Sequence, residues 1–244
     1  MEYFRYEACE YDRGRKGEDV PFWIKEASRI ANLDFHSLIL DLGCGTGNYT
    51  LRFKEETLRA VCGLDPSIDM LKVGRLKSLG GLIDWLCGVA ESIPFRDESF
   101  DCIFSSQVWH HIQNKPKAAK ECYRVLKGHS PLIIRTISHD QWREKTICDF
   151  FPEILSSQIK VYPSIVEFKE YLGKAGFRRI DILPYRLERY TYPEEFVEAA
   201  EKKLWSMFRY VTEENLKKGI ERLRNLAGQP LRNDELITLV IGWK

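Results

Sequence analysis

The feature that most constrains the fold is a short apolar run that ends in glycines at alternate positions. Residues 38–42 read Leu-Ile-Leu-Asp-Leu, and Gly43, Gly45 and Gly47 follow at once. A short apolar run bounded by turn residues predicts a buried strand, and residues 49–53 can continue the chain as a helix. This order brings backbone N–H groups and a helix N-terminus against a ligand, and glycine tolerates the positive φ and close approach that such a turn needs. We therefore expect a ligand-binding turn here; an ordinary strand-to-helix turn of small residues is the alternative.

Composition indicates a soluble globular protein. The chain has 244 residues, of which 44% are hydrophobic and 30% are charged, enough for the core of one large or two small domains. The net charge is +1, from 37 basic and 36 acidic residues, which argues against a broad nucleic-acid surface. No apolar run approaches the length of a membrane span, and the charged N-terminus lacks the apolar core of a secretion signal. We expect no membrane association.

The seven cysteines are odd in number and form no Cys-x-x-Cys pair. This spacing disfavours a disulfide scaffold and a structural zinc site. Several of them, including Cys62, Cys87 and Cys102, lie in apolar runs, where cysteine acts as a small buried hydrophobe. We expect a cytoplasmic protein with no bound metal.

Strand-like and helix-like segments alternate through the first half of the chain. The expected strands are residues 38–42, 58–64, 83–88, 100–105 and 132–136, and the expected helices are residues 22–31, 68–79 and 116–127. Such alternation is typical of a parallel sheet covered on both faces. The sequence therefore predicts an α/β fold, a three-layer sandwich built on a mostly parallel sheet.

The pattern changes after Ser138. Residues 139–159 are aromatic-rich and predict irregular structure. Capping-box pairs predict two helices: Ser164 with Glu167 opens one that ends at Gly176, and Thr191 with Glu194 opens one that continues to Val211. A further helix from Thr212 to Gly228 and strands at 180–183 and 236–241 complete the chain.

We expect a single domain, because no repeat, low-complexity segment or linker interrupts the chain. Its parts are an N-terminal arm and helix (1–35), a ligand-binding core (36–138), substrate-lid elements with a late strand (139–235) and a final strand (236–244).

The glycine turn resembles motif I of the class I S-adenosylmethionine (SAM)-dependent methyltransferases, in which the order Asp-Leu-Gly-Cys-Gly-Thr-Gly of residues 41–47 is a common form. The dinucleotide fingerprint Gly-x-Gly-x-x-Gly would instead place its third glycine where this chain has Asn48, which favours a ligand without a pyrophosphate. The resemblance runs in order over residues 38–137. It implies a Rossmann-like sheet with an antiparallel C-terminal strand and added C-terminal helices, and SAM as cofactor with S-adenosylhomocysteine as product.

The resemblance also assigns cofactor-binding residues. Asp65 matches the family acid that binds both ribose hydroxyls, and a carboxylate can accept two such hydrogen bonds; a helix cap before Pro66 is the alternative. Residues 65–71 resemble the family segment Asp-x-Ser-x-x-Met-Leu, in which the residue after the acid packs on adenine. The cofactor-binding residues that we expect are Asp41, Gly43, Cys44, Gly45, Gly47, Asp65, Pro66, Met70, Ala90, Glu91 and Ser105.

The loop at residues 88–95 resembles the Gly-Asp-Ala-Glu-x-Leu-Pro-Phe pattern of the ubiquinone-type group, with one departure. Val89 replaces the aspartate that commonly accepts the adenine amino group. Either the Ala90 backbone and apolar packing hold adenine, or Glu91 substitutes, or cofactor binding is weakened. Residues 100–107 then resemble the fourth strand of the family, whose end lies beside the methionine part of SAM.

Methyl transfer from a sulfonium is an in-line substitution that mainly requires alignment, and a general base is needed only if the acceptor arrives protonated. His110 and His111 are the candidate catalytic bases, because imidazole titrates near physiological pH. Paired histidines at this position also often pack against or cap the following helix, which is the alternative.

Five further residues are candidates for the substrate or the methionine end of SAM: Tyr11, Arg15, Gln107, Trp142 and Arg143. The first two loosely resemble N-terminal residues that fold over the methionine end in relatives, where an arginine can pair with the carboxylate. The aromatic residues after the fifth strand lie where loops carry specificity, whereas Phe150 and Phe151 are expected in the core.

The expected acceptor is a small molecule. No Asn-Pro-Pro-Tyr-like segment marks an amino-group methylase, and the basic residues of the helix at 116–127 are expected to form a solvated face. The alternatives are an RNA or tRNA methyltransferase, a SAM-binding protein without catalysis, and a nicotinamide-dependent oxidoreductase, which the glycine spacing disfavours. We expect a monomer or homodimer.

Overall fold

This computed structural model describes residues 12, 19–57, 60–78 and 83–244. Two of the expected site residues, Tyr11 and Arg15, lie outside the described part of the chain, and their roles stay predictions.

The chain packs as two compact units. The first runs to Thr136 and also contains Phe168–Ile182 and Val240–Lys244. The second consists of Ile137–Glu167 and Leu183–Leu239.

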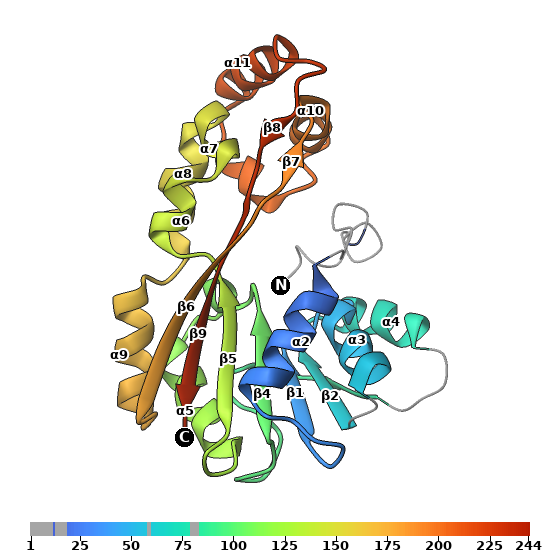
Figure 1. Ribbon diagram of the computed structural model, residues 1–244, viewed down its shortest axis with the longest axis vertical. Helices are drawn as coiled ribbons and strands as arrows, with labels where there is room; N and C mark the ends of the chain where they lie inside the picture. The colour runs from blue at the N-terminus through green and yellow to red at the C-terminus, as the bar shows by residue number, and fades with distance from the viewer. Residues whose placement is uncertain (1–11, 13–18, 58–59, 79–82) are drawn as a thin grey trace. The chain divides into compact units, whose positions relative to one another are not determined.

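A seven-stranded sheet organises the chain, in the order β3-β2-β1-β4-β5-β9-β6 (Figure 1). Its strands are β1 (Leu38–Leu42), β2 (Ala60–Asp65), β3 (Asp84–Cys87), β4 (Cys102–Ser106), β5 (Pro131–Thr136), β6 (Arg179–Leu187) and β9 (Glu235–Trp243). The strands from β3 to β5 pair in parallel. The predicted α/β fold, with its mostly parallel sheet, is confirmed.

The final strand is antiparallel, as predicted. In the first unit the N–H of Arg178, just before β6, donates to the carbonyl of Trp243 at the end of β9. In the second unit the N–H of Asn233 donates to the carbonyl of Arg189. The start of β6 therefore pairs with the end of β9, and β9 descends to the C-terminus in Figure 1.

The strand order reverses direction beside β1, which has β2 on one side and β4 on the other. Asp41 in β1 is level with Gly63 of β2 and Phe104 of β4. In open α/β sheets ligands bind outside the carboxyl ends of the strands at such a switch point. The glycine turn leaves β1 at this place.

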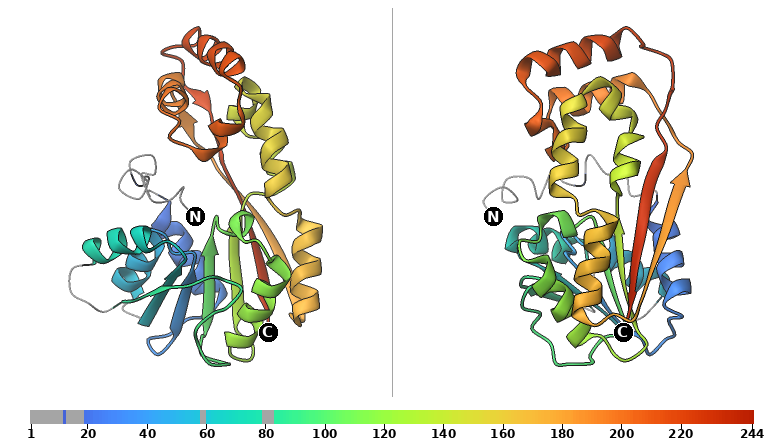
Figure 2. Two further views of the ribbon diagram at one scale, coloured as in Figure 1. Left: turned by 180° about the vertical axis from the view of Figure 1, so that it is seen from behind. Right: turned by 90° about the vertical axis from the view of Figure 1, so that its left-hand side faces the viewer.

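Helices cover both faces of the sheet in the first unit (Figure 2). They are α2 (Val20–Ile30), α3 (Asn48–Thr57), α4 (Ile68–Lys77), η1 (Trp109–His111), α5 (Lys115–Val125) and α9 (Ile165–Ala175). Residues Val20, Trp23, Ile24 and Ala27 form the buried stripe of α2, the spacing that an amphipathic helix requires. Figure 2 shows α2 on one side of the sheet and α5 and α9 on the other.

The helix expected at residues 68–79 is α4, and one of its faces is buried. Ile68 and Leu76 are 57% and 82% exposed, whereas Leu71 and Gly74 are buried. A Cβ atom on Gly74 would lie 2.8 Å from the ring of Trp85, so the absence of a side chain there lets the indole pack directly on the helix. This contact sets which face of α4 is buried.

The second unit is mostly helical (Figure 2). It contains α6 (His139–Arg143), α7 (Thr146–Phe150), α8 (Pro152–Val161), β7 (Tyr190–Thr191), α10 (Pro193–Glu201), η2 (Ser206–Tyr210), α11 (Glu213–Arg224) and β8 (Leu231–Arg232). Phe151 packs edge-on against Phe208, with ring centroids 5.3 Å apart, and a Cβ atom on Gly219 would lie 2.2 Å from the Phe151 ring. Phe150 and Phe151 are buried, as predicted.

The irregular structure expected for residues 139–159 is wrong, because this stretch forms three helices. Ser138 opens α6 with a capping box to Gln141, and Pro152 occupies the first turn of α8, where proline costs no hydrogen bond. The aromatic residues that made the stretch look irregular are core residues of short helices.

Two further expectations about the second unit are wrong. Thr191 does not cap a helix: it lies in β7 and its hydroxyl accepts from Asn233, while Glu194 accepts the N–H of Gly228. The single helix expected to reach Val211 ends at Glu201, and Lys203 has φ +49°. The capping box of Ser164 with Glu167 and the cap by Thr212 are confirmed.

Candidate functional site

The three glycines of the turn all adopt positive φ, at +75°, +53° and +81°. They differ in what surrounds them. A Cβ atom on Gly43 would lie 2.3 Å from Val108, and one on Gly47 would lie 2.2 Å from Trp85. One on Gly45 would meet no atom of the described residues within 4 Å. Gly43 and Gly47 are therefore required by packing, whereas no described residue packs against the Cβ position of Gly45.

Asp65, at the carboxyl end of β2, is joined to this turn. One of its carboxylate oxygens accepts the N–H of Gly45 at 2.9 Å, and the other accepts the N–H of Ser67 at 2.8 Å. Burial raises the pKa of Asp65, and the hydrogen bonds from Ser67 and Gly45 oppose this rise. Each oxygen keeps acceptor capacity, so the side chain can receive the two hydroxyls of a ribose. The cap of α4 is Ser67, whose hydroxyl accepts the N–H of Met70.

Three other expected cofactor residues have buried side chains. Asp41 accepts a 2.6 Å hydrogen bond from Thr50, and its pKa is raised to about 7 by burial and by the nearby charge of Asp65. Burial also raises the pKa of the Cys44 thiol, which makes it an inert packing group. Met70 is buried in the core. Their side chains support the turn from within, and any contact with a cofactor stays a prediction.

The loop after β3 contains the expected adenine site. Val89 is 42% exposed and Ala90 is buried, while Pro66 is exposed on the neighbouring segment. One carboxylate oxygen of Glu91 accepts the N–H of Asn114 at 3.0 Å, the residue that caps α5. Glu91 therefore already has a structural role, although its second oxygen can still accept a hydrogen bond.

The end of β4 combines a buried hydroxyl with a strained backbone. Ser105 Oγ is buried and has no hydrogen-bond partner among the described residues. Gln107 has φ +57°, a region that non-glycine residues seldom adopt, and its N–H donates to the carbonyl of Arg135 at 2.9 Å. Such strain is concentrated at functional sites. This strand end lies at the same sheet edge as the glycine turn.

The two histidines lie in η1, directly after β4, with ring centroids 3.9 Å apart. His111 is exposed and His110 is half-buried. Burial, followed by the positive charges of His111 and Lys115, holds the pKa of His110 well below its ordinary value. His110 is therefore neutral at physiological pH, and the same burial disfavours its protonated form.

A buried ion pair supports this sheet edge and was missed by sequence reasoning. Arg135 of β5 pairs with Asp19 at 2.7 Å, and both side chains are largely buried. The indole N–H of Trp23 donates to the same Asp19 oxygen at 2.8 Å, and the Arg135 guanidinium lies over the Trp23 ring. The one available signal was an arginine inside the apolar run Leu-Ile-Ile-Arg-Thr; its partner, 116 residues away, gave none.

The second unit holds the remaining candidates, Trp142 and Arg143. Trp142 is buried, with its ring 5.2 Å from that of Tyr162, and Arg143 forms an exposed pair with Asp140 at 2.8 Å. These contacts are explained by packing and surface charge within this unit, and roles in binding substrate stay predictions.

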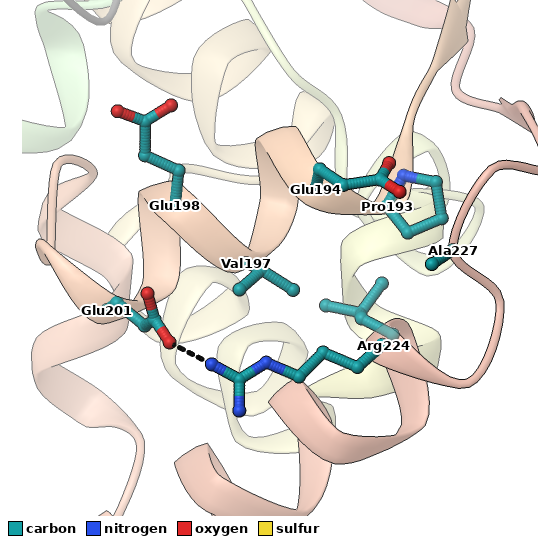
Figure 3. A pocket seen from close by; sticks show the side chains of 8 residues that line it. Pro193, Glu194, Val197, Glu198, Glu201, Arg224 and Ala227 are labelled. Carbon is teal, nitrogen blue, oxygen red and sulfur yellow. Dashed lines mark hydrogen bonds and ion pairs between the residues drawn. The ribbon is translucent and has the colours of Figure 1, made fainter.

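A cavity of ≈ 270 Å³ lies between α10 and α11 within the second unit (Figure 3). Val197 and Leu223 form part of its apolar lining. Its acidic side chains have partners: Glu201 pairs with Arg224, as Figure 3 shows, and Glu198 pairs with Lys202. No uncompensated polar group there points to a ligand.

No helix in the described part of the chain is long and apolar enough to cross a membrane. No group of three or more His, Cys, Asp or Glu side chains in that part is placed to bind a metal ion.

Comparison with known proteins gives consistent matches. A family model described as "Methyltransferase domain" matches residues 40–134. An uncharacterized methyltransferase-like protein of Schizosaccharomyces pombe is 31% identical over 199 residues, which cover 79% of this chain and 73% of that protein. The ubiquinone/menaquinone biosynthesis C-methyltransferase of Klebsiella pneumoniae is 37% identical over 169 residues, which cover 59% of this chain and 67% of that protein.

The fold has solved counterparts. A candidate methyltransferase from an antibiotic biosynthesis pathway of Anabaena variabilis superimposes with a TM-score of 0.77 over 90% of this chain and 95% of that chain. The sequences are 20% identical, so this match concerns the fold alone.

Proposed function

Because the chain belongs to the class I SAM-dependent methyltransferases, we propose that it transfers the methyl group of SAM to a small-molecule acceptor. The observation that carries this proposal is the meeting of the Gly45 N–H with the carboxylate of Asp65 at the carboxyl edge of the sheet. The site at the carboxyl edge of the sheet supplies the chemistry.

The residues of the site suit SAM. At the switch point no described residue packs against the Cβ position of Gly45, and Asp65 offers acceptor capacity to ribose hydroxyls beside it. Val89 offers adenine an apolar contact in place of a carboxylate, so we assign adenine recognition to packing and to the backbone of Ala90. Bound SAM supplies a methyl group on a positively charged sulfur.

The protein's own contribution is alignment and, for a protonated acceptor, removal of a proton. Proximity and orientation can lower the barrier of such a substitution by several kcal/mol (roughly 7–11 at best). His110 and His111 stay the candidate bases for that proton, although burial lowers the pKa of His110 and makes it a weaker base. We assign to Gln107, whose backbone has positive φ and whose N–H donates to the Arg135 carbonyl, the orientation of the methionine end or of the acceptor.

Two basic side chains, Arg124 near the end of α5 and Lys127 just after it, are paired with carboxylates, which favours a small molecule over RNA. Arg124 donates to Glu121, to Asp97 and to two backbone carbonyls, and Lys127 pairs with Asp101 at 2.9 Å. Nucleic-acid binding depends on cations that are free to neutralise phosphates, and these two are already compensated. The name of the Klebsiella pneumoniae relative, a quinone-biosynthesis C-methyltransferase, agrees with a small-molecule acceptor.

A transfer assay with methyl-labelled SAM tests the proposal. The purified protein is incubated with a small-metabolite extract and, separately, with total RNA and with protein, and the label is followed in each fraction. We expect label in the small molecules alone. Label in RNA would favour the nucleic-acid alternative, and bound SAM with no label anywhere would favour a SAM-binding protein without catalysis.

The Asp65→Ala variant is the matched negative control. Loss of the ribose hydrogen bonds should weaken SAM binding by about 1–3 kcal/mol. Unchanged affinity would refute the assignment of the ribose site.

A further inference from the structure

The carboxylate of Asp12 is held by three side chains around the glycine turn. Thr46 donates its hydroxyl at 2.8 Å and Asn48 donates its amide at 3.0 Å to one oxygen. Lys77 approaches the other oxygen at 2.7 Å. Lys77 also donates to the amide oxygen of Asn48 at 2.9 Å. The four side chains form one closed polar cluster.

The members of this cluster come from the glycine turn and from the two helices next to it. Thr46 is buried between Gly45 and Gly47. Asn48 is the first residue of α3 and Lys77 the last residue of α4. The Asp12 carboxylate therefore joins the turn, the helix that follows it and the end of the next helix.

The charges suit the helix ends they occupy. The first turn of α3 contains no acidic residue of its own, so Asp12 supplies the negative charge that a helix N-terminus favours. Lys77 stands at a C-terminus, where a cation is favoured. Burial alone would raise the pKa of Asp12, but the hydrogen bonds from Lys77, Thr46 and Asn48 outweigh it and lower that pKa. Asp12 is thus ionised at physiological pH.

An ordinary surface ion pair would contribute little, and Asp12 and Lys77 are 33% and 29% exposed. What distinguishes this cluster is its attachment to Thr46, inside the turn whose backbone forms the ligand cradle. The two flanking glycines have φ +53° and +81°, and the Gly45 N–H is the group that reaches Asp65. Rotation of the Thr46 backbone would disturb the conformation of these glycines and the hydrogen bond from Gly45 to Asp65.

We propose that Asp12 is a positioning residue of the cofactor site, whose carboxylate clamps Thr46 and Asn48 to Lys77 and so keeps the glycine turn in the conformation that accepts SAM. The inference rests on the proposed function only in taking SAM as the ligand of this turn. Asp12 acts through the turn and touches no reacting atom.

The test begins with the dissociation constant of SAM for the wild-type protein, measured by calorimetry. No SAM binding by the wild type would contradict the proposed function itself. Given binding, we expect Asp12→Ala to weaken it roughly fivefold, the size of one moderate polar coupling. The matched control is Glu55→Ala, which removes a carboxylate from an exposed 3.1 Å pair with Arg52 on α3 and should leave SAM binding unchanged.

A second variant keeps the test decisive if Asp12→Ala fails to fold. Lys77→Met should weaken SAM in the same direction, and the double variant should be no weaker than the worse single variant, because the two side chains act as one unit. The inference is overturned if SAM binds Asp12→Ala or Lys77→Met as tightly as Glu55→Ala. It is equally overturned if melting temperature falls while the SAM dissociation constant stays constant, since Asp12 would then be structural only.

Discussion

Replacing Gly45 by alanine separates ligand binding from folding at the glycine turn. Gly45 has φ +53°, and a Cβ atom there would meet no atom within 4 Å in the described part of the chain. An L-residue in the left-handed region costs about 1–2 kcal/mol, which a domain of ordinary stability, roughly 5–15 kcal/mol, can tolerate. The variant should therefore fold, but its methyl group would occupy the space that the backbone leaves for the cofactor. We expect SAM affinity to fall by about tenfold or more, since close backbone approach is what glycine allows.

Gly228→Ala is the control for backbone strain. Gly228 has φ +78°, and a Cβ atom added there would likewise meet no described atom within 4 Å. It lies in the second unit and is far from the turn in sequence. Both variants should lose similar stability in urea denaturation, while calorimetry should detect a loss of SAM affinity for Gly45→Ala alone. Gly47→Ala should lose more stability than either of these variants. Its Cβ would lie 2.2 Å from Trp85, and overpacking adds about 1–3 kcal/mol to the strain.

The reasoning would be refuted by a Gly45→Ala variant that binds SAM as tightly as the wild type. Equal losses of SAM affinity in Gly45→Ala and Gly228→Ala would refute it as well, since the effect would then be one of stability.

Two further predictions concern buried charge. The pKa of Asp41 is raised from 3.8 to about 7. Between these two pH values the folded state keeps a proton that the unfolded chain has lost. The free energy of unfolding should therefore fall as pH rises from about 4 to 7. Urea denaturation at pH 5 and pH 8 should show this fall in the wild type and a smaller one in Asp41→Asn; equal pH dependence in both would contradict it. Asp19→Ala would leave Arg135 buried without its carboxylate and should cost about 3–5 kcal/mol. Replacing Arg135 by methionine in the same chain should recover part of that loss, and an unchanged unfolding free energy for Asp19→Ala would show that the ion pair is unimportant.

The sheet of the first unit was predictable because its signals are local. Each of its strands is a short apolar run closed by a turn, and β1, β4 and β5 begin and end within two residues of the expected positions. The alternate glycines were predictable for the same reason: a strand that turns at once into a helix needs the positive φ that Gly43, Gly45 and Gly47 adopt. Local sequence could not show how the three glycines differ. Gly43 and Gly47 lie against Val108 and Trp85, whereas no described atom lies within 4 Å of a Cβ on Gly45.

The second unit was less predictable because tertiary contacts outweigh its local signals. Thr191 and Glu194 have capping-box spacing, yet each bonds to a residue from the segment after α11. Lys203, at φ +49°, ends a helix whose apolar spacing continues beyond it. Within the site, Asp12 with Lys77 and Asp19 with Arg135 are long-range polar pairs, and no spacing rule relates their partners.

The glycine turn should bind SAM and not a dinucleotide. Calorimetric titration of the purified protein with SAM and, in parallel, with NAD tests it directly. We predict a SAM dissociation constant well below millimolar, competition by S-adenosylhomocysteine, and no detectable heat from NAD. Absence of SAM binding at millimolar concentration, or tighter binding of NAD, would contradict the claim.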